Sequence, residues 1–319
     1  MDEAHLAERL EYQFGGDGRN RSLGAQIPPG FRRERGASFA AILIHLHVAA
    51  LPLLHPHRGD PLQRSPTLQA ISHMKIATYN LRSGGRGPEH WRRIETALAP
   101  DILLAQEAAD PTDLFAADPE IDCTWSAASS GAKRLKWGSA VIVRGIVRQT
   151  LTVPGFEGWI VGAEIEAPKT IGDARPLRAF SLHAPTRTGV SYFALVHAAL
   201  DAMAPFADGA RLIIGGDFNL TISPPSASES RKIKVQEQAI QERLRTEFAL
   251  GNCWRAANPE APLAQTLRWS RDPSIAYHID GLFVPLDWLL RRRACHVVTG
   301  DDWLGLSDHN PVVAEFRFG

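Results

Sequence analysis

Cysteine, net charge and long apolar runs are all scarce in this 319-residue sequence. Its 3 cysteines, Cys123, Cys253 and Cys295, are far apart, odd in number and free of Cys-x-x-Cys spacing. This pattern argues against a disulfide framework and against a cysteine-based zinc site. Lysine plus arginine and aspartate plus glutamate both total 35, so no net field attracts polyanions from a distance. A local basic patch would still suffice to bind them.

One apolar run, 39–54, is the candidate for a membrane segment. It is shorter than the roughly 20 residues that a spanning helix needs, and His45, His47 and Pro52 interrupt it. A basic stretch before it also resembles a secretory signal, although it begins far from the N-terminus. We expect residues 1–73 to be a disordered or non-essential extension and the protein to be cytoplasmic. An exported or membrane-anchored protein is the alternative, and membrane association would run only through this segment.

Four short segments place unusual polar residues beside apolar runs. Three follow such a run and the fourth precedes one, so each is expected to join a strand to a loop. An asparagine or aspartate at a strand end is more often a turn former than a ligand, so one segment alone carries little weight. Together they supply the oxygen ligands and the histidine that metal-dependent hydrolysis of phosphoesters needs. The segments are 77–80, 104–107, 215–219 and 307–311.

The apolar runs predict a mixed α/β fold. Several strands are close enough in sequence to pair antiparallel, which favours mixed sheets over a purely parallel one. Helices are expected over 91–98, 192–203 and about 231–250. We find no internal repeat and no second domain. Strands are expected over 75–79, 102–105, 139–143, 159–165, 177–182, 212–215, 281–284, 296–299 and 312–317.

In their order and their residues, the four segments resemble the motifs of the endonuclease/exonuclease/phosphatase superfamily. This group includes pancreatic-type deoxyribonuclease, exonuclease III-type AP endonucleases, sphingomyelinases and inositol-polyphosphate 5-phosphatases. Two further motifs, 180–183 and 277–283, follow in family order, and the likeness runs from Met74 to Phe318. It implies a catalytic domain over 74–319. It also implies a deoxyribonuclease I-like four-layer sandwich, with two mixed β-sheets face to face, helices outside and the active site at one edge.

Glu107, Asn80 and Asp308 are the candidate metal ligands. A carboxylate at a strand end is often merely solvated, but Gln106 and Glu107 after an apolar strand match the family's metal motif. By the same resemblance Asn80 would support the metal or the phosphate, and Asp308 would join the metal site. Oxygen ligands select Mg2+ rather than zinc, and Mn2+ is expected to substitute.

Asp217 and Asn219 flank Phe218. If the segment stays extended, both polar side chains face one way and the phenyl ring faces the other. The resemblance implies that Asp217 positions or deprotonates the attacking water, and that Asn219 binds the phosphate.

His309 is the strongest catalytic candidate, because a histidine near neutral pH serves as a general base or as a phosphate-binding cation. The resemblance makes Asp280 its orienting partner. His183 is also expected in the catalytic group. AP endonucleases resemble one another in having a tyrosine at that position, so His183 makes that subfamily less favoured.

Three further residues are expected to contact the substrate. Arg82 and Arg187 follow motif residues closely and could reach phosphates. His278 is expected to face the substrate, although a structural histidine at a strand edge is an equal alternative. Basic residues and a tryptophan also mix over 133–137, a combination that binds single-stranded nucleic acid, but a solvated loop is the commoner explanation of such a run. The basic run 291–293 is expected to be surface charge.

These features favour a magnesium-dependent phosphodiester hydrolase, specifically a deoxyribonuclease-like nuclease acting on nucleic acid. A phosphomonoesterase or a lipid phosphodiesterase of inositol-phosphatase or sphingomyelinase type is the alternative, because the core motifs are shared. A binding protein without activity is a third option, but such a protein would normally lack Glu107, Asp217, Asp280 or His309, and all are present. No obligate protein partner is evident.

Overall fold

The computed structural model describes residues 72–167, 171–226, 234–268 and 275–319. The run 39–54 and the rest of the predicted extension up to residue 71 lie outside the described residues. Among the residues that are described, no helix is long and apolar enough to cross a membrane.

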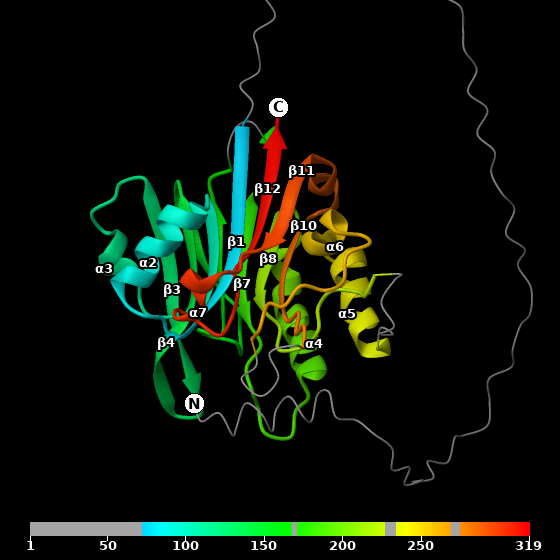
Figure 1. Cartoon of the computed structure of the whole chain (residues 1–319), viewed down its shortest axis with the longest axis horizontal. Helices are drawn as coiled ribbons and strands as arrows, with labels where there is room; N and C mark the ends of the chain where they lie inside the picture. The colour runs from blue at the N-terminus through cyan, green and yellow to red at the C-terminus, as the bar shows by residue number, and fades with distance from the viewer. Residues whose placement is uncertain (1–71, 168–170, 227–233, 269–274) are drawn as a thin grey trace, which may run out of the picture. The chain divides into compact units, whose positions relative to one another are not determined.

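Two six-stranded sheets form the centre of the fold (Figure 1). The pairs β1/β2 and β7/β8 are parallel and the other pairs are antiparallel, so both sheets are mixed, as predicted. Sheet A contains, in spatial order, β11 (Arg292–Val297), β12 (Val312–Phe318), β1 (Ser72–Gly84), β2 (Ile102–Ala108), β4 (Lys133–Arg144) and β3 (Ile121–Ser130). Sheet B contains β5 (Val147–Thr152), β6 (Ile160–Ile165), β7 (Leu177–His183), β8 (Arg211–Asp217), β10 (Asp280–Pro285) and β9 (Leu250–Asn252).

Helices cover the two outer faces, and this completes the predicted four layers. In Figure 1, α2 and α3 lie on one side of the sheets, and α4 and α5 lie on the other. On sheet A, Trp91, Phe115 and Trp303 pack against its outer face; on sheet B, Val196 and Ile240 do so. The helical segments are α2 (Pro88–Arg93), η1 (Ile94–Leu98), α3 (Thr112–Phe115), α4 (Tyr192–Met203), η3 (Ala204–Phe206), α5 (Val235–Thr246), α6 (Cys253–Ala257), η4 (Leu286–Arg291) and α7 (Asp301–Leu304).

The faces of the sheets that meet in the middle are apolar for most of their length and polar at one end. Successive side chains of a strand alternate between its two faces. On β1, Ile76 belongs to the apolar core between the sheets, and the same face continues through Thr78 to Asn80. On β8, the same face runs from Ile213 to Asp217. Alternation therefore directs these polar residues to one edge of the sandwich.

A buried polar layer ties the two sheets together just beneath that edge. The Nε2 atom of Gln106 on β2 donates to Oγ of Ser181 on β7 at 2.9 Å and to the carbonyl oxygen of Leu104 at 2.8 Å. The Ser181 hydroxyl in turn donates to the carbonyl oxygen of Ala105 at 2.7 Å. Each group is paired, so this layer adds hydrogen bonds between the sheets without leaving a costly unsatisfied group.

Gly216→Ala is expected to destabilise the fold because there is no room for a methyl group. A Cβ atom at Gly216 would lie 1.7 Å from the carbonyl oxygen of Leu182, which is backbone of the neighbouring strand. Overpacking of this kind costs about 1–3 kcal/mol or more in the free energy of unfolding. Urea denaturation would measure it, with Gly305→Ala as the control because no atom lies within 4 Å of a Cβ there. Equal stability of the two variants would contradict the expectation.

Some strand boundaries differ from those predicted. β3, β5 and β9 are strands where none was predicted, and β4 begins at Lys133, so the basic run 133–137 is strand rather than loop. These segments are polar and partly exposed, and their pairing with neighbours decides their conformation.

Several ends of the predicted elements also shift, among them that of β11, which starts at Arg292 rather than at residue 296. β1 begins at Ser72, which pairs with Phe318, so the sheet starts two residues before Met74. The helix expected over 231–250 is described only as α5, and Leu250 already belongs to β9. The run 291–293 spans the end of η4 and the start of β11, where Arg291 and Arg293 are exposed as expected.

Candidate active site

Six polar residues from both sheets converge at the polar edge of the sandwich. β1, β2, β7 and β8 end there, β10 begins there because it runs antiparallel to β8, and the loop before β12 returns there. The residues are Asn80, Glu107, His183, Asp217, Asp280 and His309.

Asn80 links the carboxylates of the two sheets. Its Nδ2 atom donates to Oδ2 of Asp217 at 3.0 Å and lies 3.4 Å from Oε1 of Glu107. Its Oδ1 atom accepts from the backbone N–H of Arg82 at 2.9 Å, which fixes the orientation of the amide. The amide nitrogen therefore lies between two buried carboxylates.

Glu107 reaches the site through an unusual backbone conformation. Strand alternation would place it with Leu103 and Ala105, which pack on the outer face of sheet A. Its φ of 48° lies in the left-handed region, which interrupts the alternation. The carboxylate then accepts from the backbone N–H of Ser83 at 2.7 Å, and Ser83 also has a positive φ, of 50°. Strained backbone of this kind is concentrated at functional sites.

Asp217 and Asn219 do not form the extended segment that the sequence suggested. Phe218 does point away, into the outer core of sheet B, but Asn219 has a left-handed φ of 52°. Its backbone N–H donates to Oδ1 of Asp217 at 2.8 Å, and its Nδ2 donates to the carbonyl oxygen of Ala184 at 2.9 Å. The local turn that this hydrogen bond closes is favoured over a strand, and Asn219 serves in this state to hold Asp217 and the loop after β7.

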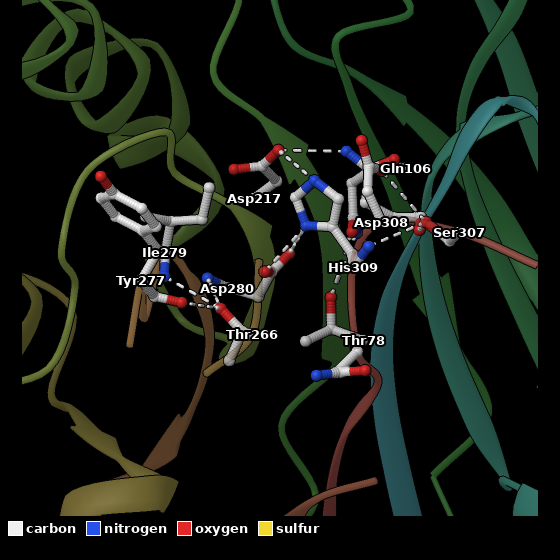
Figure 2. Close-up of polar contacts among 12 residues, drawn as sticks. Thr78, Gln106, Asp217, Thr266, Tyr277, Ile279, Asp280, Ser307, Asp308 and His309 are labelled. Atoms are coloured by element: carbon white, nitrogen blue, oxygen red, sulfur yellow. Dashed lines mark hydrogen bonds and ion pairs between the residues drawn. The ribbon is translucent and has the colours of Figure 1, made fainter. Parts of the chain in front are cut away.

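His309 and Asp280 form a buried pair (Figure 2). Nδ1 of His309 lies 2.9 Å from Oδ2 and 3.1 Å from Oδ1 of Asp280. The backbone N–H of His309 donates to the Ser307 hydroxyl at 3.1 Å, and that of Asp280 donates to the Thr266 hydroxyl at 3.1 Å. Nε2 of His309, on the other side of the ring, is 3.8 Å from Oδ2 of Asp217.

The carboxylates decide the charge of His309. Burial opposes a charged imidazole, but Asp280 and then Asp217 outweigh it and raise the pKa of His309 to about 10. Burial, with a contribution from Asp280, raises the pKa of Asp217, while His309 and His183 oppose that rise. The imidazole is therefore held as a cation at neutral pH, with Nδ1–H on Asp280 and Nε2–H toward Asp217.

The donor set fits a hard divalent cation. Glu107, Asp217 and Asp280 are 8%, 2% and 0% exposed. Within the described part of the chain, their ion pairs are with histidines only. Buried carboxylates without lysine or arginine partners need another positive charge, and oxygen donors favour a cation of the magnesium type.

Two groups of residues could hold such a cation. Asp217, Asp280 and His309 each offer a ligand atom, and these atoms all lie within 4.8 Å of one another. A charged imidazole cannot coordinate a metal, however, and the pairing with Asp280 keeps His309 charged. Glu107, with Asp217 beside it, is therefore the better candidate metal site. Asn80 does not fit the predicted role of metal ligand in this structure, because its amide nitrogen faces the two carboxylates and its oxygen accepts from the backbone N–H of Arg82.

Asp308 is paired with Arg82 rather than gathered with the other carboxylates. Nε of Arg82 lies 3.4 Å from Oδ2 of Asp308, and the two side chains are 45% and 21% exposed. The structure thus places Arg82 at the rim, where a substrate phosphate could compete for it.

His183 lies against both carboxylates and between two tryptophans. Its Nε2 atom is 3.7 Å from Oε1 of Glu107 and 3.8 Å from Oδ2 of Asp217. The ring centroids of Trp137 and Trp159 lie 5.9 and 5.2 Å from that of His183. His183 therefore lies among the six polar residues that converge at this edge.

His278 and Arg187 are placed differently from the other candidates. His278 is fully buried, its Nδ1 lies 2.8 Å from the carbonyl oxygen of Ala264, and its ring packs on Trp254 at 5.5 Å. The predicted substrate-facing position is therefore wrong in this structure, and the structural alternative fits, because the ring is buried against Trp254. Arg187 is exposed and lies over the ring of Phe156 at 5.1 Å.

Sequence reasoning missed several residues that hold the catalytic groups in place. The Thr266 hydroxyl accepts from the backbone N–H groups of Ile279 and Asp280 at 3.0 and 3.1 Å (Figure 2). The Ser307 hydroxyl donates to the carbonyl oxygen of Asn80 at 2.8 Å. Ser307 stands inside the motif 307–311 and could have been found; nothing in the sequence near Thr266 signals its role.

The fold and the site together define a class of protein. Buried carboxylates beside a charged histidine, at one edge of a two-sheet sandwich, are the arrangement of a hydrolase that acts on phosphoric esters. Residues 77–309 match the Endonuclease/Exonuclease/phosphatase family, and the chain belongs to this family of metal-dependent enzymes. The predicted family, fold and enzyme class are confirmed.

Individual relatives are more distant. "Transposon TX1 uncharacterized 149 kDa protein" of Xenopus laevis is 26% identical over 204 residues, which is 61% of this chain and only 15% of that protein. The structure of the 3′ phosphatase NExo from Neisseria bound to product DNA hairpin has a TM-score of 0.56 at 18% identity, covering 76% of this chain and 99% of that one. The endonuclease domain of TRAS1, a telomere-specific non-LTR retrotransposon, has a TM-score of 0.52 at 17% identity, covering 77% and 99%. At such identities the solved structures support the fold alone.

Proposed function

We propose that this chain is a magnesium-dependent phosphodiesterase that cleaves nucleic acid, a nuclease of deoxyribonuclease-like character. The observation that carries the proposal is the convergence of donors on one point. Oδ2 of Asp217 lies 3.0 Å from Nδ2 of Asn80 and 3.8 Å from Nε2 of both His183 and His309. These donors are thus gathered around Asp217, within reach of a phosphoryl oxygen that gains negative charge beside it in the transition state.

Each residue has a role that follows from its position. Glu107 would hold the cation, which supplies charge neutralisation and a more acidic bound water, and Asn80 would hold the Glu107 and Asp217 carboxylates in place. Mn2+ is expected to replace Mg2+. Asp217, next to both histidines, is placed to orient water and accept its proton. His309, kept charged by Asp280, neutralises the phosphate, and His183 is placed to protonate the leaving oxygen.

Nucleic acid is favoured as the substrate by two further observations. The solved structures above include one bound to a DNA hairpin and one named as an endonuclease domain. In this chain, Arg82 is exposed at the rim, where a substrate phosphate could compete with Asp308 for its guanidinium group.

A substrate panel tests the proposal. We expect cleavage of plasmid DNA and single-stranded DNA with Mg2+ or Mn2+ and none in excess chelator, with His309→Ala protein as the background control. Duplexes with and without an abasic site should be cleaved at rates within about tenfold, because His183 replaces the AP-endonuclease tyrosine. RNA, a 3′-phosphorylated hairpin, sphingomyelin and inositol phosphates complete the panel. Turnover of only the lipid or inositol substrates, or full activity in chelator, would overturn the proposal.

A further inference from the structure

A basic and aromatic surface lies beside His183, on the hairpin formed by β3 and β4. β4 runs antiparallel to β2, and Gly138 pairs with Ala108, the residue that follows Glu107. The residues of β4 before Gly138 therefore extend past the end of β2 at the active edge of the sandwich. Lys133, Arg134 and Lys136 are exposed there.

The hairpin is irregular where it passes the site. Between the pairs Ala127–Gly138 and Ser129–Arg134, β3 advances by two residues and β4 by four. Such bulges redirect a side chain and are frequent next to active sites. Here the irregular stretch contains Trp137, whose ring lies 5.9 Å from that of His183 at an interplanar angle of 37°.

Trp137 is partly exposed but firmly placed. Trp159 meets it edge to face, with centroids 5.6 Å apart and planes at 86°. Trp159 is itself fixed, because its Nε1 donates to the carbonyl oxygen of Ser129 at 3.0 Å and its own carbonyl accepts from the Ser139 hydroxyl at 2.9 Å. A partly exposed indole with a rigid support is a stacking surface that loses little entropy on binding.

The charges on the hairpin are available to a polyanion. Across the residues that the structure describes, Lys133, Arg134 and Lys136 form no ion pair with a carboxylate, whereas the arginines of α5 are paired with Glu242 and Glu247. Unpaired cations beside an aromatic ring favour the phosphates and bases of a single strand. A paired base in a duplex hides its face, so an unpaired base is needed for stacking.

We propose that Trp137, with Lys133, Arg134 and Lys136, forms a subsite for a single-stranded nucleic-acid segment that flanks the cleaved phosphate, with an unpaired base stacked on Trp137. This inference rests on the proposed nuclease function for its catalytic meaning. The enzyme then prefers single-stranded or frayed substrates over a closed duplex.

Binding without chemistry tests the subsite directly. The probe is a fluorescein-labelled 12-nucleotide oligothymidine in excess EDTA, followed by anisotropy with full-length protein. Trp137→Ala should weaken binding by about tenfold or more, the effect of losing one stacked base, and Trp137→Phe should recover it to within about threefold. A blunt duplex of the same length should be less affected. Melting temperatures check that both variants are folded. If Trp137→Ala does not fold, the binding of Trp137→Phe still tests whether an aromatic ring is sufficient at this position.

Salt dependence tests the charges. Lys133→Ala/Lys136→Ala should reduce the slope of log Kd against log salt by about 0.7 for each phosphate that the lysines no longer neutralise. Arg293→Ala/Arg317→Ala is the matched control, because both arginines are exposed at the opposite end of sheet A. Equal slopes for the two double variants would overturn the electrostatic part of the inference.

Turnover separates this inference from its alternatives. If Trp137→Ala lowers turnover of bis(p-nitrophenyl) phosphate by the same factor as that of the oligonucleotide, Trp137 only positions His183 and the subsite is refuted. If the enzyme cleaves DNA but Trp137→Ala binds the oligonucleotide as tightly as the wild type does, the subsite is refuted and the nuclease proposal stands. Trp137-dependent binding of an oligonucleotide that is never cleaved would support the subsite and refute the nuclease proposal.

Discussion

His309→Ala should lower turnover by about 10²–10³-fold, the loss that follows the removal of one donor that stabilises negative charge in the transition state. The imidazole is buried, held by Asp280 at 2.9 Å and aimed at Asp217, so its loss removes a fixed positive charge from the site. Turnover of DNA and of bis(p-nitrophenyl) phosphate would measure the loss, and circular dichroism would check the fold. His296→Ala is the matched control, because His296 is exposed on β11. Turnover within a few-fold of wild type would rule out the assignment.

Asp280→Asn completes this test through its pH dependence. Asp280 is the largest of the influences that raise the pKa of His309, so its loss should lower that pKa from about 10. A group with a raised pKa is charged below that pKa and loses its charge as pH rises through it. The alkaline limb of the rate profile should therefore move to lower pH in Asp280→Asn, with a smaller loss of turnover than in His309→Ala.

Glu107→Gln should raise the metal concentration required for activity by about 100-fold or more. Even residues that only support a metal ligand cost about 10–100-fold in affinity when replaced, and Glu107 is the charged ligand itself. The amide has nearly the same shape, so the fold should persist. Activity as a function of Mg2+ and isothermal titration of Mg2+ would both report the change.

Stability offers a readout that does not depend on turnover. Mg2+ should raise the melting temperature of the wild type, since a ligand that binds only the folded state stabilises it, and Glu107→Gln should lose most of that increase. Without metal, the variant should be at least as stable as the wild type, because one of two buried carboxylates beside Asn80 is removed. Glu120→Gln, an exposed carboxylate, is the control. An equal metal-induced shift in all three proteins would refute the assignment.

Most of the candidate site was predictable because it consists of strand ends. Asn80, Asp217 and Asp280 lie on strands whose apolar residues face the other sheet, and alternation carries the polar residues to the same edge. The position of Glu107 relied on its motif, since alternation alone would send it outward and only its left-handed backbone brings it back.

What the sequence could not reveal depends on contacts between distant segments. Thr266 supports Asp280 from a loop 14 residues away, and nothing local marks it. The burial of His278 follows from its packing on Trp254, which periodicity cannot indicate. The charged residues from Lys133 onward favoured a solvated loop. Their pairing with β3, which makes them a strand, is visible only in the folded chain.

The hydrogen bonds that Ser181 makes with Gln106 and with the carbonyl of Ala105 join the two sheets and resist sliding of one sheet over the other. Sheet A supplies Glu107 and Asn80, and sheet B supplies Asp217 and His183, so any sliding of one sheet over the other would pull the catalytic group apart. Because these hydrogen bonds fix the two sheets directly below the site, any adjustment to the shape of a substrate has to occur in the segments at the rim. Under the proposed function, substrate preference would then be set by the β3–β4 hairpin at the rim, while the residues beneath stay constant.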